Sequence, residues 1–123
     1  NFLNKKYPGI TEYIADKTFA KKNAMLIYNK KLSVCPLTTH IPIKKVYKYI
    51  TKKNIIDKTI LINDFYKKYR NIKPKIAILG LNPHCESTDK FNEDDKVLKP
   101  AIRSLKKSGF KKINISFYAL CQK

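Results

Sequence analysis

Two histidines, His40 and His84, are the residues of this 123-residue sequence best suited to chemistry. His40 follows an apolar run that ends near Leu37, and His84 follows one that ends near Leu81. If both runs are strands of one open α/β sheet, both imidazoles lie beyond strand carboxyl ends, where such sheets bind ligands. They could then share one metal ion or one anionic substrate, although catalytic metals usually take three protein ligands. The alternative is that two unrelated loop histidines fall at strand ends by chance.

The three cysteines add no second site. Cys35, Cys85 and Cys121 are widely spaced, and no Cys-x-x-Cys pair indicates a zinc knuckle or a redox motif. We therefore expect free thiols, as in a cytoplasmic protein. Cys35 lies in an apolar run and is expected to be a small core residue.

Alternating helical and extended segments must position these residues. Four helices are expected, at residues 12–22, from residue 42, at 54–70 and at 93–108. Four strands are expected, at residues 24–28, 32–37, 75–81 and 112–118. Thr11 is expected to cap the first helix, and Gly109 to end the last one. This order predicts an α/β fold with a largely parallel sheet.

The composition is that of a globular chain with a large positive charge. The formal net charge is +18, and 43% of the residues are hydrophobic. No apolar run approaches the roughly 20 residues of a membrane helix, which argues against an integral membrane protein. Arginine, the residue best suited to reading bases and phosphates, occurs only at positions 70 and 103. Because the lysines are scattered as pairs, compositional drift is favoured over a nucleic-acid surface.

Four short motifs surround the candidate residues. They are Pro-Gly-Ile-Thr-Glu-Tyr at 8–13, Leu-Thr-Thr-His-Ile-Pro at 37–42, Ile-Leu-Gly-Leu-Asn-Pro-His at 78–84 and Pro-Ala-Ile at 100–102. In order and spacing they resemble the 4-hydroxythreonine-4-phosphate dehydrogenase family of vitamin B6 biosynthesis. Each motif is weak alone, but the four in register form a strong signal.

The resemblance implies both a fold and a reaction. The fold is a fragment of the isocitrate/isopropylmalate-dehydrogenase-like α/β/α type, in a homodimer with its active site at the subunit interface. The reaction is oxidation of 4-phosphooxy-L-threonine, a phosphorylated amino acid, by NAD, followed by decarboxylation. His40 and His84 would be two of three histidines that hold a divalent metal (Zn, Mg or Co), whose Lewis acidity that chemistry needs. Thr11 matches a substrate-binding position, and the location implied is cytoplasmic.

The resemblance has limits that shape the expectation. Ile10 stands where the family has a histidine, the loop after His84 lacks the family's glycines, and the match fades after about Ile113. Because it spans roughly the middle third of a family chain, we expect residues 1–123 to form a single partial domain, truncated at both ends and inactive alone. Two alternatives stay open: a lysine-rich nucleic-acid-binding module, and a non-catalytic structural remnant of the fold.

Overall fold

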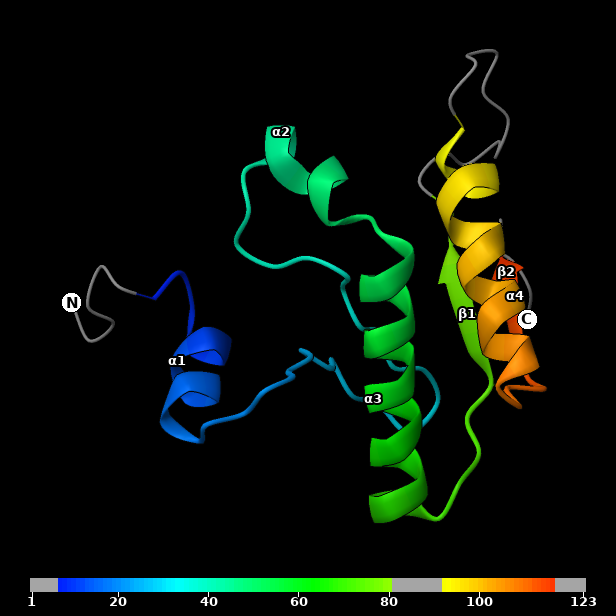
Figure 1. Cartoon of the computed structure of the whole chain (residues 1–123). Coiled ribbons are helices and arrows are strands. Elements are labelled where there is room, and N and C mark those ends of the chain that lie inside the picture. The colour runs from blue at the N-terminus through cyan, green and yellow to red at the C-terminus, as the bar shows by residue number, and fades with distance from the viewer. Residues whose placement is uncertain (1–6, 81–91, 117–123) are drawn as a thin grey trace.

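The computed structural model describes residues 7–80 and 92–116. Its elements in chain order are α1 (Ile10–Lys17), α2 (Ile43–Val46), the 3-10 helix η1 (Tyr47–Tyr49), α3 (Lys52–Arg70), β1 (Ile76–Leu79), the π-helical turn η2 (Asp94–Leu98), α4 (Lys99–Lys107) and β2 (Ile113–Ser116). Figure 1 shows α1 set apart from α3, which lies beside the β1, α4 and β2 unit. Across the described ranges, no helix combines the length and apolarity needed to cross a bilayer.

The sheet is parallel, as the sequence predicts. β1 and β2 pair with Ile76 opposite Ile113, and α4 lies between them in the chain. Along β1 the residues alternate: Ile76 and Ile78 are half-buried, whereas Ala77 and Leu79 are exposed. Since alternate strand residues point to opposite faces, only one face of this sheet is covered within the described residues. The α/β class is therefore confirmed, with two layers of the expected three described.

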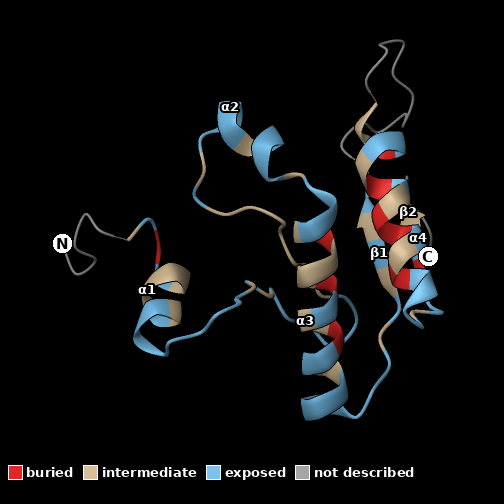
Figure 2. Cartoon of the chain, viewed as in Figure 1, coloured by how far each residue is buried: buried red, intermediate tan, exposed pale blue. Residues whose placement is uncertain are grey.

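The core lies between that face and the helices α3 and α4. One buried cluster is made by Ile55, Leu98 and Ala101, and a second by Ile102, Leu105 and Ile113. Ile56 of α3 and Ile78 of β1 pack against both clusters and so join them. Figure 2 shows the buried residues concentrated on α3 and α4.

The ends of α3 and α4 follow ordinary capping chemistry. Thr51 caps α3 by accepting a hydrogen bond from the Asn54 backbone N–H at 3.2 Å. After α4, Gly109 adopts a φ of 92°, and the N–H groups of Gly109 and Phe110 donate to the carbonyls of Lys106 and Leu105, both at 3.1 Å. This pair of bonds is a Schellman motif, which confirms that Gly109 ends the last helix.

The expected cap of the first helix is wrong. α1 begins at Ile10, with Gly9 at the N-cap and no side-chain cap. The Tyr13 N–H donates to the Gly9 carbonyl at 3.2 Å, so Thr11 already lies inside the first turn. The helix also ends at Lys17 rather than at residue 22, because Phe19 adopts a left-handed φ of 53°.

The expected strands at 24–28 and 32–37 are also wrong. They reduce to one antiparallel bridge, in which Ile27 and Val34 exchange backbone hydrogen bonds of 2.8 and 2.9 Å. Ile27 and Val34 are both exposed, and Pro36 has no N–H to donate to a ladder. An isolated pair of short strands is marginal without a sheet or helix to cover it.

Candidate functional site

A hollow in the described structure lies between the start of α1, the loop at residues 37–41 and the first half of α3. We call it the His40 hollow; its volume is about 430 Å³. Asn54, Asp57, Lys58 and Leu61 line it from α3. Their spacing of three or four residues places them on one face of that helix. The buried residues Ile55, Thr59 and Asn63 form the stripe beside it, so one helix serves both core and hollow.

His40 enters this hollow on a strained backbone and beside a glycine. Its φ of 53° lies in the left-handed region, which non-glycine residues seldom occupy. A methyl group placed on Gly9 would lie 2.5 Å from both Cδ2 and Nε2 of His40, which is closer than atoms can pack. The ring therefore fits only because residue 9 has no side chain.

Glu12 of α1 lies at the same place. The methyl position on Gly9 that is 2.5 Å from His40 Nε2 is also 2.9 Å from Glu12 Oε2. The other carboxylate oxygen, Oε1, accepts a hydrogen bond of 3.0 Å from the Thr39 hydroxyl. Oε2 is buried and accepts no hydrogen bond within the described structure. Glu12 thus joins two segments that are 27 residues apart in the chain.

The far wall carries an ion pair. Lys22 Nζ donates to Asp57 Oδ1 at 2.8 Å, which ties the segment after α1 to α3. This hydrogen bond, with the positive charges of Lys22 and Lys53, holds the pKa of the Asp57 carboxyl below its usual range. The pair therefore links the two segments across one wall of the hollow.

Cys35 is half-buried beside this wall, which fits the expectation of a small packed residue only in part. Burial raises the pKa of its thiol, and the positive charge of Lys58 opposes part of that rise. Its S–H points to the Pro36 carbonyl at 3.7 Å, a weak contact. Cys35 is therefore a poor nucleophile at neutral pH.

The structure describes two of the three predicted site residues and places them in different hollows. His40 is exposed at the wall of the His40 hollow. Thr11 lines a second, smaller hollow of about 250 Å³ between α1 and residues 18–25. His84 lies outside the described residues, so its approach to His40 stays a prediction. Within residues 7–80 and 92–116, no three His, Cys, Asp or Glu side chains form a metal site by themselves.

Sequence reasoning missed the roles of Gly9 and Glu12. Both belong to the first motif, Pro-Gly-Ile-Thr-Glu-Tyr, and the one available signal was their place beside Thr11. Their contacts with His40 and Thr39 cross 27 residues or more, a separation that local pattern cannot bridge. An imidazole beside a carboxylate is a donor arrangement that fits a divalent metal ion.

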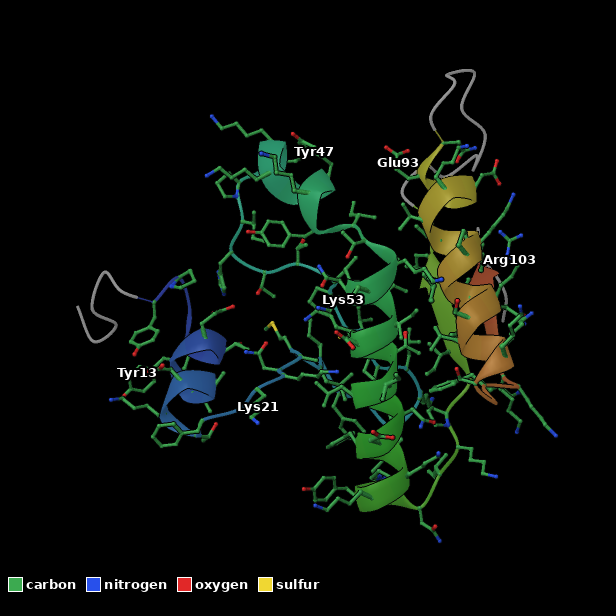
Figure 3. The ribbon with its side chains drawn as sticks, viewed as in Figure 1. Tyr13, Lys21, Tyr47, Lys53, Glu93 and Arg103 are labelled. Carbon is green, nitrogen blue, oxygen red and sulfur yellow. The ribbon has the colours of Figure 1, made fainter. Side chains whose placement is uncertain are left out.

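Three of the basic side chains lie apart on different parts of the chain. Lys21 follows α1, Lys53 lies in the first turn of α3, and Arg103 lies on α4; Figure 3 labels all three, spread across the view. A nucleic-acid interface needs a continuous basic patch or stripe. These three side chains do not form one.

Comparison with known proteins gives one consistent family. The sequence model described as "Pyridoxal phosphate biosynthetic protein PdxA" matches residues 2–116. The chain is 47% identical over 105 residues to the 4-hydroxythreonine-4-phosphate dehydrogenase of Sulfurihydrogenibium sp., and 41% identical over 108 residues to that of Aquifex aeolicus. These alignments cover 84% and 86% of this chain. Each covers 33% of the relative, so the chain spans about a third of their length.

A solved structure and a further relative agree. The crystal structure of 4-hydroxythreonine-4-phosphate dehydrogenase from Klebsiella pneumoniae superposes with a TM-score of 0.76 at 28% identity, covering 89% of this chain and 34% of that one. The D-threonate 4-phosphate dehydrogenase of Salmonella typhimurium is 33% identical over 104 residues, which are 84% of this chain and 32% of the relative.

Proposed function

Because the chain belongs to the family described as pyridoxal phosphate biosynthetic protein PdxA, we propose that it carries part of the substrate and metal site of a 4-hydroxythreonine-4-phosphate dehydrogenase. The observation that carries this proposal is His40, which enters a hollow on a strained backbone near the half-buried Glu12, whose Oε2 atom is buried. Such strain persists where a functional site requires it. The motif around His40 matches the family's metal-binding motif.

The proposal assigns each group a task. His40, with His84 and a third histidine from outside this sequence, holds a divalent ion (Zn, Mg or Co), and Thr11 binds the substrate. When bound, the ion supplies Lewis acidity that eases removal of hydride by NAD and the decarboxylation that follows. The proposal includes a homodimer with an active site at the subunit interface and a cytoplasmic location. All of these follow from the family resemblance.

The proposed substrate is the phosphorylated amino acid 4-phosphooxy-L-threonine. Two relatives that carry the 4-hydroxythreonine-4-phosphate name are 47% and 41% identical to this chain, against 33% for the D-threonate 4-phosphate enzyme. The two substrates differ at C2, where one has an ammonium group and the other a hydroxyl. Calorimetric titration of the chain with each compound tests this choice. We expect the amino compound to bind more tightly, and equal binding would contradict the choice.

The metal assignment is tested with Co²⁺, whose absorption spectrum reports ligation. We expect the chain to bind Co²⁺, and His40→Ala or His84→Ala to weaken binding at least about tenfold, since each removes a direct ligand. Cys85→Ser is the control, because it removes the thiol next to His84 but no proposed ligand. Binding that survives both histidine replacements would refute the assignment. Because the chain spans a third of its relatives, we expect no NAD reduction by it alone.

A further inference from the structure

Three observations meet at Glu12, a residue to which neither the motif match nor the comparisons give a task. Its Oε1 accepts a hydrogen bond from Thr39, the residue before His40. Its Oε2 is buried with no hydrogen-bond partner in the described structure. That oxygen and His40 Nε2 both lie within 3 Å of one point above Gly9, at 2.9 and 2.5 Å. We infer that Glu12 is the positioning residue of His40, with Oε1 holding the loop backbone through Thr39 and Oε2 accepting the imidazole Nε2–H.

The unsatisfied Oε2 of Glu12 supports the same assignment. A buried carboxylate oxygen costs free energy unless a donor reaches it, so such an oxygen marks a missing partner. His40 Nε2 can donate its N–H and lies 2.5 Å from the same Cβ position on Gly9 that is 2.9 Å from Oε2. Lys22, the ammonium on the opposite wall, already donates to Asp57. His40 and Glu12 form no hydrogen bond or ion pair among the described residues, so the bond that we infer requires the His40 ring to turn toward Oε2.

The inferred hydrogen bond also determines which ring nitrogen of His40 keeps a lone pair for binding a metal. An imidazole that donates Nε2–H to a carboxylate presents Nδ1 with its lone pair. Metal-binding histidines usually have such a carboxylate or carbonyl partner, which fixes the tautomer and the ring direction. This inference rests on the proposed function only for the purpose that the fixed ring serves. The inferred hydrogen bond between Glu12 and His40 does not depend on any metal.

The inferred hydrogen bond from His40 to Glu12 is tested first without metal, by NMR of the chain carrying ¹⁵N-labelled histidine. With only two histidines in the sequence, His84→Gln assigns the signals. We expect a His40 Nε2–H resonance that exchanges slowly with water, because its proton is held against a buried oxygen. Glu12→Gln should abolish this resonance. The matched control is Asp57→Asn, which removes a carboxylate from the same hollow without touching His40.

The Thr39 branch has its own variants. Thr39→Val removes the hydroxyl that donates to Oε1 and is expected to broaden or lose the His40 signal, while Thr39→Ser keeps the hydroxyl and should restore it. If replacing Thr39 disrupted folding in general, both variants would lose the His40 signal. The backbone ¹⁵N spectrum identifies that case, and Glu12→Gln, which keeps the size of the side chain, then decides the question.

The consequence for metal is measured separately with Co²⁺. Removal of such a carboxylate partner typically costs tenfold to a hundredfold in metal affinity. We expect that loss for Glu12→Gln and no comparable loss for Asp57→Asn. A protected His40 signal that persists in Glu12→Gln, or is absent from the unmodified chain, overturns the inference. A protected signal in a chain that binds no Co²⁺ upholds the inference and counts against the proposed function instead.

Discussion

Gly9 shows how a single missing side chain makes room for a functional ring. Its φ of −162° is extended and open to any residue, so its backbone does not require glycine. What requires glycine is the His40 ring, whose Cδ2 and Nε2 would lie 2.5 Å from an added methyl group. Glycine is needed at position 9 to leave room for the His40 ring, which is part of the candidate site.

Gly9→Ala is therefore expected to displace His40 and leave the fold in place. Co²⁺ affinity should fall at least about tenfold, because the imidazole can no longer occupy its position, while the urea midpoint should change little since the core clusters lie elsewhere. The two measurements are a Co²⁺ titration and a urea titration on the same preparation. A variant that binds Co²⁺ normally would show that the ring has room to move aside.

Cys35 gives a second prediction at this scale. Because burial raises the pKa of its thiol, little thiolate is present at neutral pH, and alkylation by iodoacetamide should be slower than for a free cysteine. Lys58 lowers that pKa, so Lys58→Met should raise it further and slow the reaction again. Peptide mapping by mass spectrometry separates Cys35 from the other two cysteines. Faster labelling in Lys58→Met would contradict the electrostatic role of Lys58.

Among the elements, the sequence predicted best those that interactions between near neighbours in the chain determine. The α3 helix shows helical recurrence over many residues, so its span was predicted to within two residues. The two strands expected between residues 24 and 37 failed because apolar runs indicate burial, while burial depends on a neighbour that the sequence does not show. Glu12 was missed for the same reason, since its partners are 27 residues away or farther.

Gly109 lies at the end of α4, so its replacement tests how that helix end contributes to stability. It contrasts with Gly9, which lies at the candidate site. Its φ of 92° is costly for any residue with a side chain, and no atom lies within 4 Å of where a Cβ would be. Gly109→Ala should therefore lower the free energy of unfolding by about 1 kcal/mol through the backbone alone. Urea denaturation measures this change. Co²⁺ binding should be unaffected, the reverse of the expectation for Gly9→Ala, and a stability loss well above that size would indicate a role beyond the Schellman motif.

At the scale of the whole molecule, a small hydrophobic core must offset the self-repulsion of a large net charge. Among residues 7–80 and 92–116, the fully buried side chains are few, with Leu105 and Ile113 the largest, and one face of the sheet exposes Leu79 at 53%. Against this core stands a net charge of +18, whose self-repulsion opposes compaction. The same charge attracts anions, so weak phosphate binding by the chain is expected to be nonspecific. Binding that survived about 0.5 M salt, where screening acts over a few Å, would instead indicate a formed site.

The balance between core and charge predicts how stability responds to salt. We expect a shallow unfolding transition in dilute buffer that sharpens and moves upward in NaCl, because screening weakens the repulsion. Sodium sulfate at equal ionic strength should raise it further, since sulfate also strengthens apolar burial. Circular dichroism during heating, at matched ionic strengths, separates the two contributions.

A charge variant decides whether repulsion is the cause. Lys52 and Lys53 are exposed in the first turn of α3, which holds no acidic residue. Replacing both by Glu lowers the net charge by four units, from +18 to +14, and places two carboxylates at a helix N-terminus. Each should add about 0.3–1 kcal/mol in dilute buffer from the helix dipole, on top of the relief of repulsion. The gain from NaCl should shrink in the same variant. If the unmodified chain unfolds cooperatively in dilute buffer and ignores salt, its core outweighs its charge and the chain is an autonomous domain.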